Sequence, residues 1–364
     1  MNSVNMLIKP ASGNCNMRCK YCFYHSLTDI REQKDYGIMS YETLEQLVKR
    51  AFEGTTKSIT FAFQGGEPTL CGLDFYYKFE YFIEKYNTQS IEVNRAFQTN
   101  GYIIDDNWCK YFKKYKYLVG LSLDGPKEIN DLNRIDINKD GTYQKIMNAK
   151  KLFDEYLVEY NVLCVVNREV ARYAKKVYQF FKDNNIRHIQ YINCLDELGK
   201  KQGTNKYSLT WQRYLKFLKD TFDMWYEDIM NDDVYVIRQF DNYIAMILGH
   251  SPESCNMNGY CSCQFVVEAD GSVYPCDFYV IDKYKIGNVY DNSLKEMFES
   301  DTTRRFISES VIENPKCKRC KWYSICRNGC KRERQNNLNE FCDAYYNFFN
   351  YAYERMEQIA RRYR

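Results

Sequence analysis

Three cysteines near the N-terminus are spaced closely enough to hold one metal centre. Cys15, Cys19 and Cys22 follow the pattern Cys-x3-Cys-x2-Cys, just after the first predicted strand. Three thiolates can bind three corners of a cubane iron–sulfur cluster and leave the fourth iron without a protein ligand. Such an open position allows a substrate or cofactor to bind the metal. A structural zinc ion is the alternative, for which His25 could supply a fourth ligand.

A second and denser group of cysteines lies in the last third of the chain. Its members are Cys255, Cys261, Cys276, Cys317, Cys320, Cys326, Cys330 and Cys342. A zinc-ribbon module would be satisfied by two sets of four thiolates, but it would leave the N-terminal triad unexplained. The chain has sixteen cysteines and only three histidines. This composition favours thiolate-bound metal or iron–sulfur clusters, since disulfides are rare in a reducing cytosol.

Polar segments, three of which contain glycine, lie at the ends of four of the predicted strands. They are Gln64-Gly65-Gly66-Glu67-Pro68, Gln98-Thr99-Asn100-Gly101, Ser122-Leu123-Asp124-Gly125 and Asn193-Cys194-Leu195. Glycine lets the backbone approach a ligand closely, and Glu67 could accept a hydrogen bond from an ammonium group. Each turn alone is an ordinary end of a strand. Because the carboxyl ends of parallel strands gather at one edge, we expect the four turns to line the same rim.

The segments that must position these residues alternate between strand and helix patterns. Strands are predicted over Val4–Ile8, Ser58–Phe63, Ile91–Gln98, Leu118–Leu123, Glu159–Val166 and His188–Cys194. Helices are predicted over Tyr41–Phe52, Asp74–Lys85, Asp106–Lys114, Thr142–Tyr156 and Glu169–Asp183. Repeated strand-then-helix units imply parallel strands with right-handed crossovers. Six units are too few for an eight-unit barrel of roughly 250 residues, so we predict an α/β fold with a partial (β/α)6 barrel.

The alternation stops at about Thr210. The remaining predicted elements are two helices, Thr210–Met230 and Phe240–Leu248, a hairpin of Cys263–Glu268 and Ser272–Cys276, and a closing helix, Ala344–Ala360. We therefore divide the chain into a barrel domain, residues 1–235, and a cysteine-rich domain with its closing helix, residues 236–364.

The charge balance and hydropathy of the chain exclude some classes of partner. Lys plus Arg number 51 and Asp plus Glu number 48, a net charge of +3, which gives no reason to expect a nucleic-acid or membrane-surface partner. The most apolar runs are of strand length, far short of a membrane span. Residues 1–9 have neither a basic head nor an apolar signal core. We expect the protein to remain in the cytoplasm.

Together, the N-terminal triad, the Gly-Gly-Glu turn and the C-terminal cysteines resemble a radical S-adenosylmethionine (SAM) enzyme with a SPASM domain. The resemblance implies three [4Fe-4S] clusters. Cys15, Cys19 and Cys22 would hold the one that binds SAM and cleaves it to a 5′-deoxyadenosyl radical. The first auxiliary cluster would be held by Cys255, Cys261, Cys276 and Cys330. The second would be held by Cys317, Cys320, Cys326 and Cys342, and neither auxiliary cluster would have an open iron.

The same resemblance assigns contacts for SAM. In the family the Gly-Gly-Glu turn holds the amino group, Ser122 and Arg134 meet the ribose and the carboxylate, and Leu195 meets the adenine. The implied cofactor-binding residues are Tyr24, Gln64, Gly65, Gly66, Glu67, Gln98, Asn100, Ser122, Arg134 and Leu195. From the residues alone, these are turn residues, and Arg134 is a solvated helix charge.

A closer resemblance is to the anaerobic sulfatase-maturating enzymes. It is carried by Cys22-Phe23-Tyr24-His25, Phe63-Gln64-Gly65-Gly66-Glu67-Pro68, Gln98-Thr99-Asn100-Gly101, Leu123-Asp124-Gly125-Pro126, Ile192-Asn193-Cys194-Leu195-Asp196 and Tyr274-Pro275-Cys276-Asp277-Phe278-Tyr279. Such enzymes oxidise a Cys or Ser of a sulfatase to Cα-formylglycine. The implied steps are abstraction of a Cβ hydrogen atom by the radical, removal of the thiol or hydroxyl proton by a base, and loss of an electron to the adjacent auxiliary cluster.

Asp277 is the candidate base, because it follows a cluster ligand in the family motif. The other interpretation of Asp277 is an aspartate bonded to backbone amides at the end of a hairpin. Tyr24, Gln64, Gln190, Asn193 and Arg238 are candidate contacts for the peptide substrate, since amide side chains can both donate to and accept from a peptide. An electron donor such as flavodoxin or ferredoxin is also implied.

Two rival functions remain open from the sequence. A SPASM maturase of another peptide, forming a thioether crosslink or an epimer, would share every cysteine ligand. Because the cysteine loop begins at residue 15, we expect no N-terminal recognition domain of the kind that such enzymes often carry, which favours the sulfatase maturase. A non-catalytic electron carrier with three clusters would have no use for a barrel rimmed by polar turns. Release of 5′-deoxyadenosine from SAM would discriminate an enzyme from a carrier.

Overall fold

Seven parallel strands form most of one sheet in the computed structural model, which describes residues 1–363. The strands are β1 (Ser3–Ile8), β2 (Ser58–Phe63), β3 (Glu92–Thr99), β4 (Leu118–Ser122), β5 (Tyr160–Val166), β6 (His188–Asn193) and β7 (Val236–Ile237), and they lie in that order. Ile8 lies beside Phe63, and Phe63 lies beside Phe97. The carboxyl ends of neighbouring strands therefore meet at one edge, as the polar turns of the sequence require.

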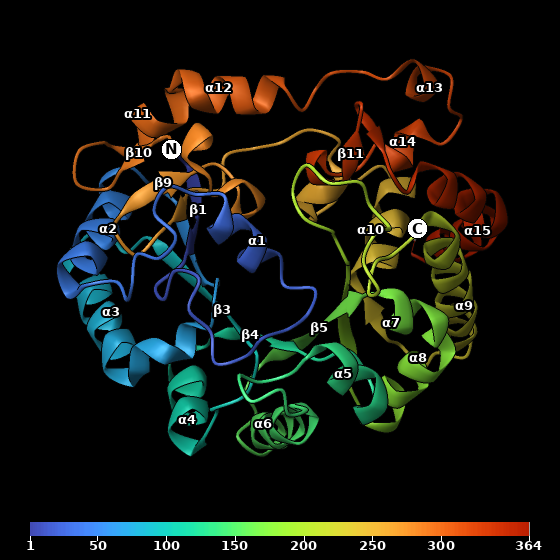
Figure 1. Ribbon diagram of the computed structural model, residues 1–364, viewed down its shortest axis with the longest axis horizontal. Coiled ribbons are helices and arrows are strands. Elements are labelled where there is room, and N and C mark those ends of the chain that lie inside the picture. Colours follow the sequence, from blue (N-terminus) through green and yellow to red (C-terminus); the bar gives the residue numbers. More distant parts are fainter. Residues whose placement is uncertain (364) are drawn as a thin grey trace.

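Helices cover the outside of the curved sheet (Figure 1). They are α2 (Tyr41–Glu53), α3 (Gly72–Tyr86), α4 (Asp106–Tyr115), α5 (Lys127–Asn133), α6 (Tyr143–Glu155), α7 (Arg168–Arg172), α8 (Ala174–Asp183), α9 (Trp211–Met230) and α10 (Arg238–Ile247). Several of these helices begin after a side chain that accepts hydrogen bonds from the backbone N–H groups of the first helical turn. Ser40 accepts from the N–H of Thr43 before α2, and Asp105 accepts from the N–H of Trp108 before α4.

Aromatic side chains fill the space between the sheet and helices α3 and α4. The ring of Phe63 lies 5.0 Å from that of Tyr76 and 4.9 Å from that of Phe79, with the ring planes nearly perpendicular. Tyr76 in turn lies 5.2 Å from Phe97 on β3. These four side chains are almost completely buried. Burial of this apolar surface holds the helices on the strands that end at the rim.

The cysteine-rich part of the chain extends the barrel sheet. Its elements are β8 (Val266–Val267), β9 (Ser272–Tyr274), β10 (Gly287–Asn288), α11 (Leu294–Glu299), α12 (Asp301–Ser308), α13 (Pro315–Lys318), α14 (Tyr323–Cys326), β11 (Arg334–Gln335), β12 (Leu338–Asn339) and α15 (Cys342–Arg362). Strand β8 pairs in parallel with β1, and β9 pairs antiparallel with β8. The hairpin predicted from the sequence thus joins the free edge of β1, and one ten-stranded sheet spans both parts.

Helix α15 closes the molecule by packing along α9, as Figure 1 shows near the C-terminus. The ring of Phe348 on α15 lies 5.6 Å from that of Phe222 on α9. Tyr345 lies 5.6 Å from Tyr214, with the two ring planes nearly perpendicular. Since Cys342 begins α15, this packing also positions one of the C-terminal cysteines.

The fold class predicted from the sequence is confirmed, and the differences are local. The helix expected over 169–183 is divided at Tyr173, whose backbone (φ −111°, ψ 32°) leaves the helical range. The hairpin strands are shorter than expected, because only Val266–Val267 and Ser272–Tyr274 pair. A two-residue strand, β7, adds one more parallel partner beside β6.

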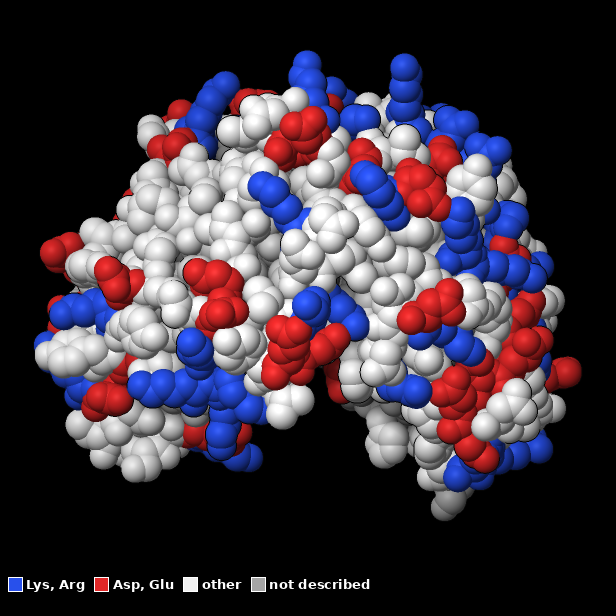
Figure 2. Space-filling model, turned by 90° about the horizontal axis from the view of Figure 1, so that it is seen from below, with Lys and Arg blue, Asp and Glu red and all other residues white. Residues whose placement is uncertain are grey.

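Charged side chains of both signs are interspersed over the face drawn in Figure 2, and that face is notched at one edge. This mixture agrees with the small net charge of the chain. Within residues 1–363, no helix is both long and apolar enough to cross a lipid bilayer.

Candidate active site and metal centres

The N-terminal cysteine loop lies between β1 and a short helix, α1 (Phe23–Asp29), with Cys22 as the residue that caps the helix. Burial raises the pKa of the Cys15 thiol to about 12 and that of the Cys19 thiol to about 11. Thiols in such a place become thiolates when a cation compensates their charge, and a coordinating thiol is deprotonated outright by its metal. The chemistry of this set of donors therefore fits bound iron.

Positive groups of the protein face two of these thiols. Burial raises the pKa of Cys19, and the guanidinium of Arg134 opposes that rise. Burial also raises the pKa of Cys22, and the backbone N–H groups of Tyr24 and His25 oppose it. Both contacts would stabilise negative charge on the sulfur atoms of a thiolate-ligated centre.

Three buried polar atoms around this loop have no hydrogen-bond partner in the protein. They are Nδ2 of Asn16, Nε of Arg134 and Oδ1 of Asp277. Unpaired buried polar atoms are costly, so each is best explained by a partner that arrives from outside the chain. Two donors and one acceptor beside the cysteine loop suit a polar, charged cofactor and a substrate bound next to it.

Glu67, the carboxylate of the Gly-Gly-Glu turn, ties the end of β2 to the end of β3. Its Oε1 accepts hydrogen bonds from the hydroxyls of Thr69 (2.7 Å) and Thr99 (2.8 Å). Its Oε2 accepts from the N–H of Asn100 at 2.7 Å, which leaves that oxygen room for one more donor. Burial raises the pKa of Glu67, and these hydrogen bonds oppose the rise.

The two glycines before Glu67 have left-handed backbones, with φ of +91° at Gly65 and +55° at Gly66. A Cβ atom on Gly66 would lie 2.1 Å from the carbonyl oxygen of Asn14. A Cβ atom on Gly65 would lie 2.8 Å from the side chain of Lys9. The turn therefore packs directly against the start of the cysteine loop, and only glycine fits there.

The other predicted SAM contacts lie at the ends of β3, β4 and β6. Gln98, Ser122 and Leu195 are half-buried there. Arg134 is buried, and its Nη1 donates to the hydroxyl of Tyr21 (3.1 Å), which donates to Asp124 (2.5 Å). Sequence reasoning missed Tyr21 and Asp124 as members of the site. Their positions inside the cysteine loop and in the Leu-Asp-Gly turn were the available signal.

Asp277 is held by Tyr24 and Gln64, which the sequence predicted as contacts for SAM and for the peptide substrate. Its Oδ2 accepts from the hydroxyl of Tyr24 at 2.6 Å and from Nε2 of Gln64 at 3.0 Å. Its Oδ1 accepts no hydrogen bond, although Nζ of Lys9 lies 3.7 Å away. Burial raises the pKa of Asp277, and the charge of Lys9 opposes that rise. The carboxylate therefore presents one unoccupied oxygen beside the cysteine loop.

A buried group of charged side chains, which the sequence did not reveal, lies next to Asp277 and includes Lys9. Glu268 forms ion pairs with Arg31 (2.6 Å) and Lys9 (3.5 Å), and all three side chains are at most 3% exposed. Lys9 also lies 4.1 Å above the ring of Tyr24. Removing one member of such a group leaves an uncompensated buried charge, so the group fixes the position of Lys9 beside Asp277.

The three remaining candidate substrate contacts lie on β6 and at the start of α10. Nη1 of Arg238 donates to Oε1 of Gln190 at 3.0 Å, and the guanidinium lies 3.8 Å from Glu253. Asn193 donates to Glu333 at 2.9 Å. Gln190 and Arg238 are thus brought together, whereas Asn193 bonds to the cysteine-rich part of the chain.

The eight C-terminal cysteines fall into two spatial sets of four. Burial raises the pKa of the Cys276 thiol, and the thiols of Cys330, Cys255 and Cys261 raise it further. In the same way Cys326 is affected by Cys342, Cys320 and Cys317. These are the two quartets that the family resemblance implies.

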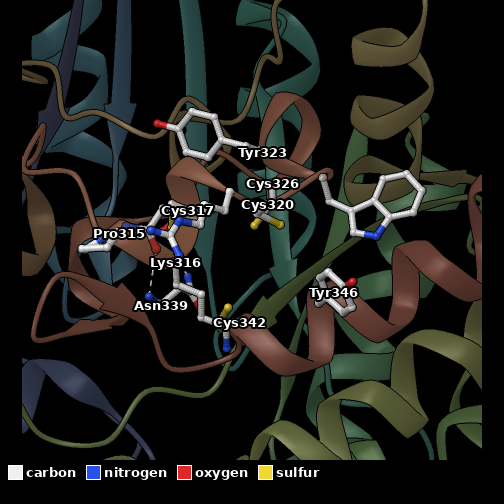
Figure 3. A pocket seen from close by; sticks show the side chains of 12 residues that line it. Pro315, Lys316, Cys317, Cys320, Tyr323, Cys326, Asn339, Cys342 and Tyr346 are labelled. Carbon is white, nitrogen blue, oxygen red and sulfur yellow. Dashed lines mark hydrogen bonds between the residues drawn. The ribbon is translucent and has the colours of Figure 1, made fainter.

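The second quartet lines a cavity of about 470 Å³. Figure 3 shows the sulfur atoms of Cys320, Cys326 and Cys342 directed toward one another across this cavity. Lys316, Trp322 and Tyr346 form part of its wall. A cavity with four thiols in its lining has the donors and the room that a thiolate-bound cluster needs.

One tight turn joins the two quartets. Arg327, Asn328 and Gly329 have successive φ values of +49°, +64° and +58°, which reverse the chain between Cys326 and Cys330. The turn therefore carries a member of each quartet at its two ends.

Within residues 1–363, no three Cys, His, Asp or Glu side chains form a group that could hold one metal ion. A tetrahedral zinc site needs its thiolates about 2.3 Å from one centre.

Two family models match the chain, and together they define its class. The Radical SAM superfamily model matches residues 10–181, and the SPASM model, described as an iron–sulfur cluster-binding domain, matches residues 255–321. The protein is therefore a radical SAM enzyme with a SPASM domain, which uses SAM and [4Fe-4S] clusters.

Relatives that match along nearly the whole chain identify the family within this class of enzyme. The chain is 47% identical to the cysteine-type anaerobic sulfatase-maturating enzyme of Clostridium novyi, covering 99% of this chain and 98% of that protein. It is 29% identical to the serine-type enzyme of Bacteroides thetaiotaomicron, covering 95% and 89%. The solved structure of native anSMEcpe with bound AdoMet and Cp18Cys peptide superposes with a TM-score of 0.96 at 46% identity, covering 100% of both chains. The chain belongs to the family of anaerobic sulfatase-maturating enzymes.

Proposed function

We propose that this enzyme oxidises a cysteine side chain in a sulfatase polypeptide to Cα-formylglycine. The observation that carries the proposal is the unpartnered Oδ1 of Asp277, a buried carboxylate oxygen beside the cysteine loop and next to Cys276. The choice of cysteine over serine rests on identity, since the chain shares 47% with a cysteine-type relative and 29% with a serine-type one.

The residues that would hold the cofactors are those of the loop, the rim and the two quartets. Cys15, Cys19 and Cys22 would bind the cluster that receives SAM, and the Glu67 turn and Arg134 would bind SAM itself. When bound, this pair supplies a carbon radical that can remove a hydrogen atom from the substrate Cβ. Residues 1–235 would form the radical domain, and residues 236–364 would hold the two auxiliary clusters.

Asp277 would take the proton of the substrate thiol on Oδ1. Tyr24 and Gln64 occupy Oδ2, so they aim the free oxygen and stabilise the ionised form. The charge of Lys9 also favours the carboxylate over the protonated acid. Gln190 and Arg238 would hold the peptide backbone, which keeps the reacting side chain between the radical and the base.

An external protein such as flavodoxin or ferredoxin would supply the electron that starts SAM cleavage. The oxidised side chain would give up one electron in turn, and Cys276, beside Asp277 in the chain, would hold the nearer auxiliary cluster that receives it. The thioaldehyde formed from cysteine would then hydrolyse to formylglycine.

The test is a mass measurement on peptides under anaerobic conditions. Reconstituted enzyme, SAM and a reductant are expected to lower the mass of a cysteine-containing sulfatase peptide by about 18 units, because sulfur and two hydrogens leave and oxygen enters. A serine peptide that reacted would lose about 2 units, and so would a thioether crosslink. An aldehyde-trapping reagent separates these two outcomes. Release of 5′-deoxyadenosine without any aldehyde would reject the proposal in favour of another peptide maturase.

A further inference from the structure

The side-chain amide of Asn100 has a defined orientation at the end of β3. Its Oδ1 accepts a hydrogen bond from the backbone N–H of Tyr102 at 2.9 Å. An oxygen must occupy that position, because the partner is a donor. The NH2 group of Asn100 therefore points the other way, toward the cysteine loop.

That NH2 group contacts the first cysteine of the loop. Nδ2 of Asn100 lies 3.6 Å from Sγ of Cys15 and 2.8 Å from Oδ1 of Asn16. The backbone N–H of Met17 donates to the same sulfur at 3.3 Å. Cys15 is thus the sulfur atom of the loop that receives a side-chain amide as well as a backbone N–H.

Burial and hydrogen bonds fix the position of Asn100. Asn100 is 7% exposed, and its backbone N–H donates to Oε2 of Glu67. Oδ1 of Asn16 accepts a hydrogen bond from the NH2 group of Asn100, whereas Nδ2 of Asn16 has no partner. The contact with Cys15 is therefore built into the end of β3, and a rotation of the amide would break two hydrogen bonds.

We propose that Asn100 is a positioning residue that raises the reduction potential of the cluster bound by Cys15, Cys19 and Cys22, by donating an N–H to Sγ of Cys15. The inference rests on the proposed function only in taking Cys15 as a ligand of that cluster. Hydrogen bonds to cluster sulfurs are one of the means by which proteins set cluster potentials. A donor stabilises the reduced cluster more than the oxidised one, since reduction adds negative charge that the sulfur atoms share.

The experiment is an anaerobic potentiometric titration followed by electron paramagnetic resonance. The part of the reduced-cluster signal that changes when SAM is added identifies the N-terminal cluster among the three. In N100D, which keeps the acceptor for Tyr102 but loses the donor, the reduced-to-oxidised ratio at a fixed potential should fall about tenfold, or about 59 mV for one electron. N100A removes the donor without adding charge and should shift the potential less, in the same direction.

Asn94 provides the matched control, because it lies exposed on β3, six residues before Asn100. N94D adds the same charge and should leave the potential unchanged. Iron content and circular dichroism equal to wild type establish that the variants are folded and loaded. A potential in N100D equal to that in N94D, or a rise in N100A, would overturn the inference. Both results are independent of peptide turnover, so a failure of the proposed function would show separately, as absence of formylglycine from wild-type enzyme.

Discussion

At the scale of single residues, the two oxygens of Asp277 have different surroundings. Oδ2 accepts from Tyr24 and Gln64, whereas Oδ1 has no donor. A carboxylate that only capped a hairpin would bond to backbone amides, which was the competing interpretation from the sequence. Both bonds to Oδ2 come instead from side chains on other elements of the barrel.

Replacing Asp277 by asparagine should therefore remove a base while keeping the shape of the site. We expect D277N to form product 10²- to 10⁴-fold more slowly, the range that a positioned general base contributes. Release of 5′-deoxyadenosine should continue, because the cysteine loop is untouched. Quantitative chromatography of both products measures the two rates. The control is D291N, which makes the same substitution at Asp291, an exposed aspartate in the same half of the chain. Wild-type product formation by D277N would remove Asp277 from the mechanism.

The sequence motifs identified Asp277, Tyr24 and Gln64 as site residues. They did not identify the buried charged side chains next to Asp277. Glu268 and Arg31 meet although 237 residues separate them. A buried ion pair between two loops leaves no periodic signal in the chain, because periodicity reports only which face of one element is buried. Such contacts follow from the three-dimensional arrangement of the hairpin against β1.

At the scale of elements, the strand ends were predictable to within one or two residues, since alternation of buried and exposed side chains stops where a strand leaves the sheet. For example, the strand predicted over Ser58–Phe63 is β2 itself. The hairpin strands were overestimated because Phe265 has a left-handed backbone, with φ of +46°, which interrupts the extended chain although the N–H of Gln264 still donates to the carbonyl of Pro275.

The close packing of Gly66 against the cysteine loop predicts that a larger residue at this position weakens SAM binding. G66A should displace the start of the cysteine loop, because its Cβ would overlap the carbonyl oxygen of Asn14 at 2.1 Å. We expect the affinity for SAM to fall at least about tenfold, the equivalent of about 1.4 kcal/mol. Equilibrium dialysis of reconstituted enzyme with SAM measures it.

Gly249 is the matched control for this substitution. It also has a positive φ, of +90°, but a Cβ there would meet no atom within 4 Å. G249A therefore carries only the backbone strain of a left-handed alanine, on the order of 1–2 kcal/mol of stability. If G66A and G249A bound SAM equally well, close packing of the turn against the loop would have no role in binding.

At the scale of the whole molecule, the cysteine-rich part is attached to the barrel at two places far apart. Strand β8 pairs with β1 at one edge of the sheet. Helix α15 packs on α9 and α10, and α10 contacts β6 and β7 at the other edge of the sheet. The sequence predicted a closing helix over Ala344–Ala360, but a helical pattern in one segment does not identify the element that covers it.

The contact of α15 with α9 should stabilise both the fold and the second cysteine quartet. Phe348 is fully buried, 5.6 Å from Phe222 and 5.9 Å from Phe240. F348A should lower the free energy of unfolding by about 3–5 kcal/mol, the usual cost of removing a buried ring. Anaerobic urea unfolding of the cluster-loaded enzyme, followed by circular dichroism, measures the loss.

Glu354, exposed on the same helix, is the control, and E354A should unfold as wild type does. Since α15 begins at Cys342, loosening of the helix in F348A should also speed the loss of iron to a chelator. Cys15, Cys19 and Cys22 lie outside this contact, so the SAM-dependent part of the resonance signal should decay last. If the two signals decayed together, α15 would stabilise the molecule as one cooperative unit and would have no special effect on the quartet at its first residue.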